Sequence, residues 1–113
     1  LNGIDTLLAG RTGSWQPVTV STSNWSGTVA YRINADGEVQ LKGSVTVPTG
    51  GSGGTIFTLP AGYYSTSVSM RGAAAAQSSG TVGYITISNS GVVTGSNPGV
   101  GNSLYLDGIT CPV

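Results

Sequence analysis

Apolar residues alternate with polar residues along most of this 113-residue chain, and short glycine-rich segments separate the alternating runs. A period of two places every second side chain on the same face of a β-strand. The clearest run is expected to turn four side chains inward: Val39, Leu41, Val45 and Val47. Turn signals recur about every 8–12 residues, which is typical of a sandwich or barrel. The sequence therefore predicts an all-β fold, a small antiparallel β-sandwich or barrel of about seven or eight strands.

Glycines place the turns and one irregularity within this pattern. Asp36-Gly37 lies between two alternating runs and predicts a tight hairpin, because glycine accepts a positive φ. Asn89-Ser90-Gly91 predicts a second hairpin, and Gly43 predicts a bulge or a close approach of two backbones. Val68 and Met70 are two positions apart and so lie on the same face of a strand, which is expected to face the core.

Two further segments complete the predicted strands. The alanines from Ala73 to Ala76 are too few to nucleate a helix between Gly72 and Gly80, and their small side chains would allow two backbones to approach closely. The last strand is expected to continue from Leu104 through Ile109, with Leu104 and Leu106 on one face.

The first residues follow a different period. Leu1, Ile4 and Leu8 recur at spacings of three and four, as the a and d positions of a heptad do. Two interpretations stay open: a short amphipathic helix packed on its own domain, or the end of a coiled-coil stalk. We expect residues 1–10 to be the end of a helical stalk, residues 11–14 a hinge and residues 15–113 a β head domain.

Composition excludes several classes of function. Only 7% of the residues are charged and the formal net charge is zero, so no basic face for nucleic acid can be assembled. Histidine is absent and Cys111 is the single cysteine, which excludes a disulfide framework and the usual zinc sites. We therefore expect no metal and no cofactor. No apolar stretch approaches the ~20 residues of a membrane span, so no membrane insertion is expected.

Catalysis is not indicated by the titratable residues. Asp36 and Glu38 are the nearest candidates for a pair of catalytic carboxylates, but they flank a hairpin, where Asp36 is better interpreted as the turn-forming residue. A serine or cysteine nucleophile lacks a histidine base. Cys111 is interpreted as a small buried apolar residue.

Surface recognition by aromatic rings is the remaining chemistry. Six large amphipathic side chains are present: Trp15, Trp25, Tyr63, Tyr64, Tyr84 and Tyr105. Most rings in a thin β domain belong to the core or to a subunit interface. Rings in loops are the better candidates for stacking on a sugar. The predicted saccharide-binding residues are Asn24, Trp25, Tyr63, Tyr64 and Arg71.

The order of these features resembles a known family. Val29-Ala30-Tyr31-Arg32 precedes the hairpin Asp36-Gly37-Glu38-Val39-Gln40-Leu41-Lys42-Gly43, and Thr55-Ile56-Phe57-Thr58-Leu59-Pro60-Ala61-Gly62-Tyr63 follows. Together with the segments from Ile85 and from Leu104, this pattern is similar to the C-terminal head domain of bacteriophage tail fibre and minor tail proteins. Tyr64-Ser65 stands where that family usually carries Arg-Pro.

The resemblance implies a homotrimeric head on a fibrous stalk, located at the tail tip of a virion beside other tail proteins. It implies attachment to a saccharide of the host cell surface, without catalysis. Two alternatives remain: a purely structural cap that registers the trimer, and a carbohydrate-binding module of a secreted bacterial protein.

Overall fold

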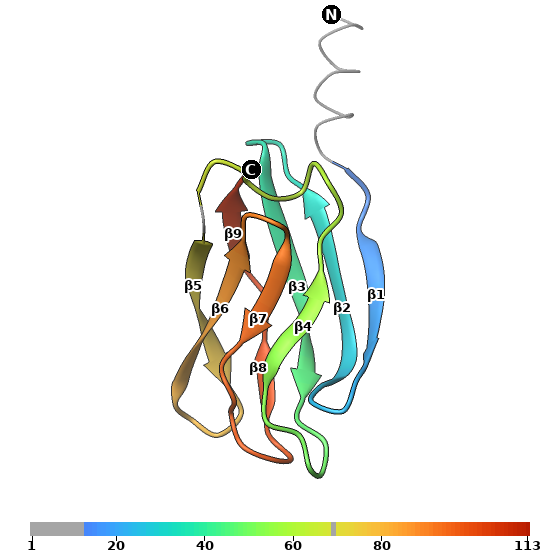
Figure 1. Cartoon of the computed structure of the whole chain (residues 1–113), viewed down its shortest axis with the longest axis vertical. Helices are drawn as coiled ribbons and strands as arrows, with labels where there is room; N and C mark the ends of the chain where they lie inside the picture. Colours follow the sequence, from blue (N-terminus) through green and yellow to red (C-terminus); the bar gives the residue numbers. More distant parts are fainter. Residues whose placement is uncertain (1–12, 69) are drawn as a thin grey trace, which may run out of the picture.

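The structure is a computed structural model that describes residues 13–68 and 70–113, and within them it is all-β (Figure 1). Its nine strands are β1 (Gln16–Ser21), β2 (Ser26–Ile33), β3 (Glu38–Thr46), β4 (Gly54–Thr58), β5 (Met70–Gln77), β6 (Val82–Ser88), β7 (Val92–Gly95), β8 (Ser103–Tyr105) and β9 (Ile109–Pro112). The predicted stalk residues Leu1, Ile4 and Leu8 lie outside the described residues. No helix in the described ranges is long and apolar enough to cross a membrane.

All the strands belong to one antiparallel sheet in the order β1-β2-β3-β8-β5-β6-β7-β4, and β9 pairs with β3. The sheet curls until it is nearly closed into a barrel, with β1 and β4 as its edges. Core side chains join the two sides. Tyr31 of β2 stacks on Phe57 of β4 with ring centroids 6.0 Å apart. The predicted all-β architecture is therefore confirmed.

The core contains the side chains that alternation predicted. Each of the four apolar residues predicted to point inward on and after β3 is at most 1% exposed: Val39, Leu41, Val45 and Val47. The two predicted hairpins also form, with positive φ at Gly37 and at Gly91. Cys111 is buried on β9, as predicted. Burial of this apolar surface is the main contribution to the stability of the fold.

One long strand, β3, pairs with two short ones in succession. Ser44–Thr46 pair with β8, whereas Glu38–Leu41 pair with β9. The change of partner occurs opposite Gly43, whose φ is +104° and whose hypothetical Cβ would lie 2.8 Å from the Cα of Val29. The predicted close approach of backbones at Gly43 is therefore confirmed, and only glycine fits there without a shift of β2.

Two details of the sequence prediction are wrong. Val68 and Met70 are 37% and 57% exposed instead of facing the core. The reason is that β5 begins at Met70 and turns the other set of alternate side chains inward, the set to which Ala75 belongs. The predicted last strand is divided into β8 and β9, and the backbone N–H of Ile109 donates to the carbonyl of Leu106 at 3.2 Å in the intervening turn. This turn resets the alternation, so Ile109 is buried.

Candidate functional site

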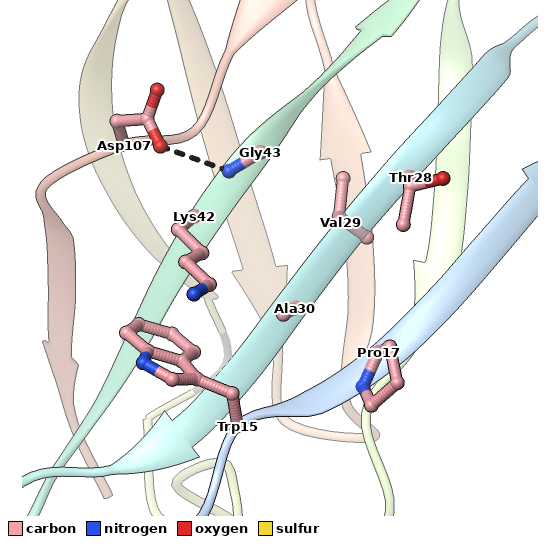
Figure 2. Close-up of a pocket in the computed structure, with 8 residues that line it drawn as sticks. All are labelled: Trp15, Pro17, Thr28, Val29, Ala30, Lys42, Gly43 and Asp107. Atoms are coloured by element: carbon pink, nitrogen blue, oxygen red, sulfur yellow. Dashed lines mark hydrogen bonds between the residues drawn. The ribbon is translucent and has the colours of Figure 1, made fainter.

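A groove of about 420 Å³ opens on the outer surface of β2 and β3 (Figure 2). Its residues come from four parts of the chain: Trp15 and Pro17 at the start of β1, Thr28, Val29 and Ala30 on β2, Lys42 and Gly43 on β3, and Asp107 in the turn before β9. The groove therefore exists only in the folded sheet, where the first and last strands of the chain lie beside the central hairpin.

The floor of the groove is low because its residues are small. In the register of the sheet, Ala30 is paired with both Pro17 and Lys42, and Val29 is paired with Gly43. Ala30 is buried and Gly43 has no side chain, so the surface sinks between larger neighbours. Trp15, Lys42 and Asp107 stand around this depression. A concave surface with an apolar floor and a few polar groups is the usual form of a ligand site.

Two cations fix the indole of Trp15. The guanidinium carbon of Arg32 lies 4.4 Å from the centroid of its ring, and the ammonium of Lys42 lies 4.3 Å from it. The Nε of Arg32 also donates a hydrogen bond of 3.0 Å to the side chain of Gln40 on β3. Cation–π contacts of this kind are attractive, so the half-buried ring is held over the sheet instead of turning freely.

Asp107 brings a carboxylate to the groove from the other end of the chain. Its Oδ1 accepts a hydrogen bond of 3.0 Å from the backbone N–H of Gly43, at the place where β3 changes partner (Figure 2). In the part of the chain that the structure describes, the other carboxylate oxygen has no hydrogen-bond partner. The exposed carboxylate can therefore accept a hydrogen bond from a ligand in the groove.

The predicted saccharide residues at the β1–β2 turn do not belong to this groove. Trp25 is 0% exposed, and its Nε1 donates to the carbonyl of Gly54 at 3.1 Å. Because its faces are covered by the core, it cannot stack on a sugar, and its assignment as a binding ring is wrong. Asn24 uses its side-chain oxygen within the protein, where it accepts hydrogen bonds from the backbone and hydroxyl of Ser52.

The other predicted residues lie elsewhere. Tyr63 and Tyr64 belong to the segment between β4 and β5, and this segment crosses the end of the barrel opposite the β1–β2 turn (Figure 1). Tyr63 packs edge-on against Tyr31 with centroids 4.8 Å apart, and Tyr64 covers Gly91. Both are half-buried. Arg71 lies on β5, where its backbone is paired with Ile87. The five predicted residues are thus not brought together in one site.

Sequence reasoning missed Trp15, Lys42 and Asp107 as members of one site. Trp15 was among the candidate rings, and Lys42 occupies an outward-facing position of its alternating strand. These two features were the available signal. Asp107 gave none, because it reaches β3 from 64 residues further along the chain.

The carboxylates considered for catalysis lie at the β2–β3 turn. The side-chain oxygen of Asn34 accepts hydrogen bonds of 3.0 Å from the backbone N–H groups of Asp36 and Glu38. Both backbone positions therefore help to form the hairpin. Within the described ranges, no three residues among the cysteines and carboxylates are close enough together to hold a metal ion.

Comparison with protein-family models, with curated proteins and with solved structures finds no match to this chain.

Proposed function

We propose that this chain is the receptor-binding tip of a bacteriophage tail fibre, which attaches the virion to a saccharide of the host surface without catalysis. It acts as a homotrimer next to other tail proteins, with Leu1, Ile4 and Leu8 in the seam of the stalk. The observation that carries the proposal is the groove beside Trp15, with its apolar floor and its carboxylate. The resemblance of the hairpin and turn pattern to tail fibre heads supports the same assignment.

The groove has the chemistry that a sugar ring needs. A pyranose has an apolar face of C–H groups, which can pack on the indole of Trp15 and on Ala30 and Pro17. Its hydroxyl groups need hydrogen-bond partners at the edges, and Asp107 and Thr28 offer oxygens there. Few polar groups around an apolar surface orient a ligand in this way.

The charge around Trp15 favours an acidic saccharide. Arg32 and Lys42 both contact one indole, and no acidic side chain of the described residues forms an ion pair with either. A carboxylate or phosphate substituent on the ligand would neutralise these cations through charge-assisted hydrogen bonds. Binding through them is expected to weaken as the salt concentration rises, because exposed charges are screened.

Each groove is shallow, so a single site is expected to bind weakly. Three copies on one fibre would raise the avidity by about 10²–10⁴-fold without any new contact, provided that the sites reach the same polymer. Weak sites reinforced by avidity suit a tip that binds a repetitive surface polysaccharide.

The test is binding of the full chain to an array of neutral and acidic saccharides and to bacterial cell-wall polysaccharide. Wild-type protein should bind, and Trp15→Ala should weaken the binding at least about tenfold, which is about 1.4 kcal/mol. Lys42→Gln should weaken binding to acidic saccharides more than to neutral ones. The matched control is Tyr64→Ala, which removes a half-buried ring that does not line the groove and should bind as wild type. A wild-type protein that binds no saccharide, or a Trp15→Ala variant that binds normally, would contradict the proposal.

A further inference from the structure

The groove beside Trp15 carries charges of opposite sign at its two ends. The ammonium of Lys42 lies 4.3 Å from the centroid of the Trp15 ring, and the guanidinium carbon of Arg32 lies 4.4 Å from it. Asp107 lies on the other side of Lys42 from this ring (Figure 2). The groove therefore has a cationic end at Trp15, which we call the tryptophan end, and an anionic end at Asp107, which we call the aspartate end.

The two charges line one groove but do not neutralise each other. Among the described residues, Asp107 forms no ion pair with Lys42 or with another cation. The ammonium of Lys42 is turned toward the indole instead (Figure 2). Oδ1 of Asp107 accepts the backbone N–H of Gly43 at 3.0 Å, which orients the carboxylate. Each charge is thus held in place by a group that does not cancel it.

A ligand that fills the groove removes water from both charges. Lys42 and Asp107 are exposed, so solvent reaches them until a ligand covers them. A charge that loses its water costs free energy unless an opposite charge replaces the water. A hydroxyl group can donate a hydrogen bond to Asp107, but it leaves the negative charge uncompensated. A protonated amine compensates the charge as well, and such charge-assisted hydrogen bonds are stronger than neutral ones.

The opposite charges also oppose a ligand that carries only one sign. A purely acidic saccharide brings further negative charge into a groove that already contains Asp107, and like charges in contact repel. A purely basic saccharide meets the same difficulty at Lys42 and Arg32. The order of the charges along the groove therefore selects both the signs on a ligand and their positions.

We infer that the ligand of the groove is a zwitterionic saccharide. Its acidic group lies at the tryptophan end and its protonated amine lies at the aspartate end, while the sugar ring between them packs on the apolar floor at Ala30. The groove of about 420 Å³ is within the usual size of ligand sites. This inference rests on the proposed function, and it names the class of saccharide that the same site binds.

The experiment compares four oligosaccharides that share the backbone of hyaluronan. Hyaluronan itself carries carboxylates only, and removal of its N-acetyl groups adds free amines. Reduction of the carboxyl groups to alcohols gives the neutral form and the form with amines only. Each is titrated calorimetrically into the full chain, at a pH where the amines are protonated and the carboxyl groups are ionised. The zwitterionic form should bind at least about threefold more tightly than each of the other three, as expected for exposed ion pairs.

Two variants should change this preference in different ways. Asp107→Asn keeps an oxygen for the N–H of Gly43 and should lose the preference for free amines, while it keeps the preference for carboxylates. Lys42→Gln should reduce the preference for carboxylates and keep that for amines. The matched control is Asp36→Asn, which removes the same charge from a residue that does not line the groove and should keep both preferences. Urea unfolding shows whether each variant is folded.

The comparison of the four forms on the wild-type protein needs no variant. If hyaluronan binds equally well with and without free amines, the inference is overturned, whereas the proposed function stands because a saccharide still binds. A loss of amine preference in Asp36→Asn as large as that in Asp107→Asn also overturns it. Absence of binding to all four forms overturns it as well. The array of other saccharides and cell-wall polysaccharide then decides the proposed function separately.

Discussion

The carboxylate of Asp107 accepts a hydrogen bond of 3.0 Å from the backbone N–H of Gly43, a residue 64 positions earlier in the chain. At Gly43 the strand β3 leaves β8 and joins β9, so this N–H has no partner in either ladder. The carbonyl of Gly43 is satisfied next to it, by the backbone N–H of Leu106 at 2.9 Å. The turn between β8 and β9 therefore replaces, at one residue, the hydrogen bonds that a continuous strand would have made.

Removing the carboxylate should destabilise the protein modestly. Asp107→Ala leaves the N–H of Gly43 to water, and because the bond is exposed we expect the free energy of unfolding to fall by about 1 kcal/mol. Asp107→Asn keeps a side-chain oxygen as acceptor and should lose less. Urea unfolding of the three proteins measures this. Equal stability of the alanine variant and wild type would show that the bond contributes nothing.

Gly43 itself should tolerate no side chain. Its φ of +104° disfavours other residues, and a Cβ would collide with the carbonyl of Thr28. We expect Gly43→Ala to lower the free energy of unfolding by about 3 kcal/mol or more. Gly72→Ala is the control, because a Cβ at Gly72 meets its nearest atom at 3.7 Å. This variant should be neutral or slightly stabilising. A similar loss of stability in both would contradict the argument.

Much of this fold could be predicted because its signals are local. The period of a strand is directly visible in the spacing of Val39, Leu41, Val45 and Val47. Glycine in a tight turn indicates a hairpin. The orientation of β5 could not be predicted in the same way. Ala73 and Ala75 are its inward residues, and alanines carry little signal of which face is buried, whereas the larger Met70 suggested the opposite parity.

The candidate site was harder to predict from the sequence, because its residues meet only through pairing between distant parts of the chain. Trp25 and Trp15 both lie beside β1 in polar surroundings of similar composition. What distinguishes them is tertiary: the turn that holds Trp25 lies against Gly54, while Trp15 lies on the outer surface with Arg32. Neither contact can be recognised from the neighbouring sequence, so the sequence does not distinguish the buried tryptophan from the one at the surface.

Truncation of the two tryptophans should therefore lower the stability to different extents. Trp25→Ala removes a fully buried ring and orphans the carbonyl of Gly54, so we expect the free energy of unfolding to fall by about 3–5 kcal/mol. Trp15→Ala removes a half-buried surface ring and should cost about 1 kcal/mol, while it weakens saccharide binding. Urea unfolding of both variants, beside the binding assay on Trp15→Ala, separates the two roles. The reverse order of stabilities would contradict this assignment of core and groove.

Alkaline pH should destabilise the barrel through Tyr31. Burial against Phe57 raises the pKa of the Tyr31 phenol above its ordinary value of 10.0, and the neighbouring Tyr63 raises it further by disfavouring a second negative charge. The folded state then holds this proton more tightly than the unfolded state does. The resulting stability is fully present below pH 10 and is lost as the pH rises through the pKa of the folded protein.

Urea unfolding at a series of pH values checks this, with Tyr31→Phe as the matched variant. The wild-type free energy of unfolding should decline above pH 10, and the variant should decline less, because phenylalanine keeps the stacking ring without the titrating group. A tyrosinate absorbance titration should show the same difference, with the component that titrates at the higher pH missing from the variant. If the two proteins lose stability in parallel as the pH rises, the alkaline transition belongs to another tyrosine and not to the contact between β2 and β4.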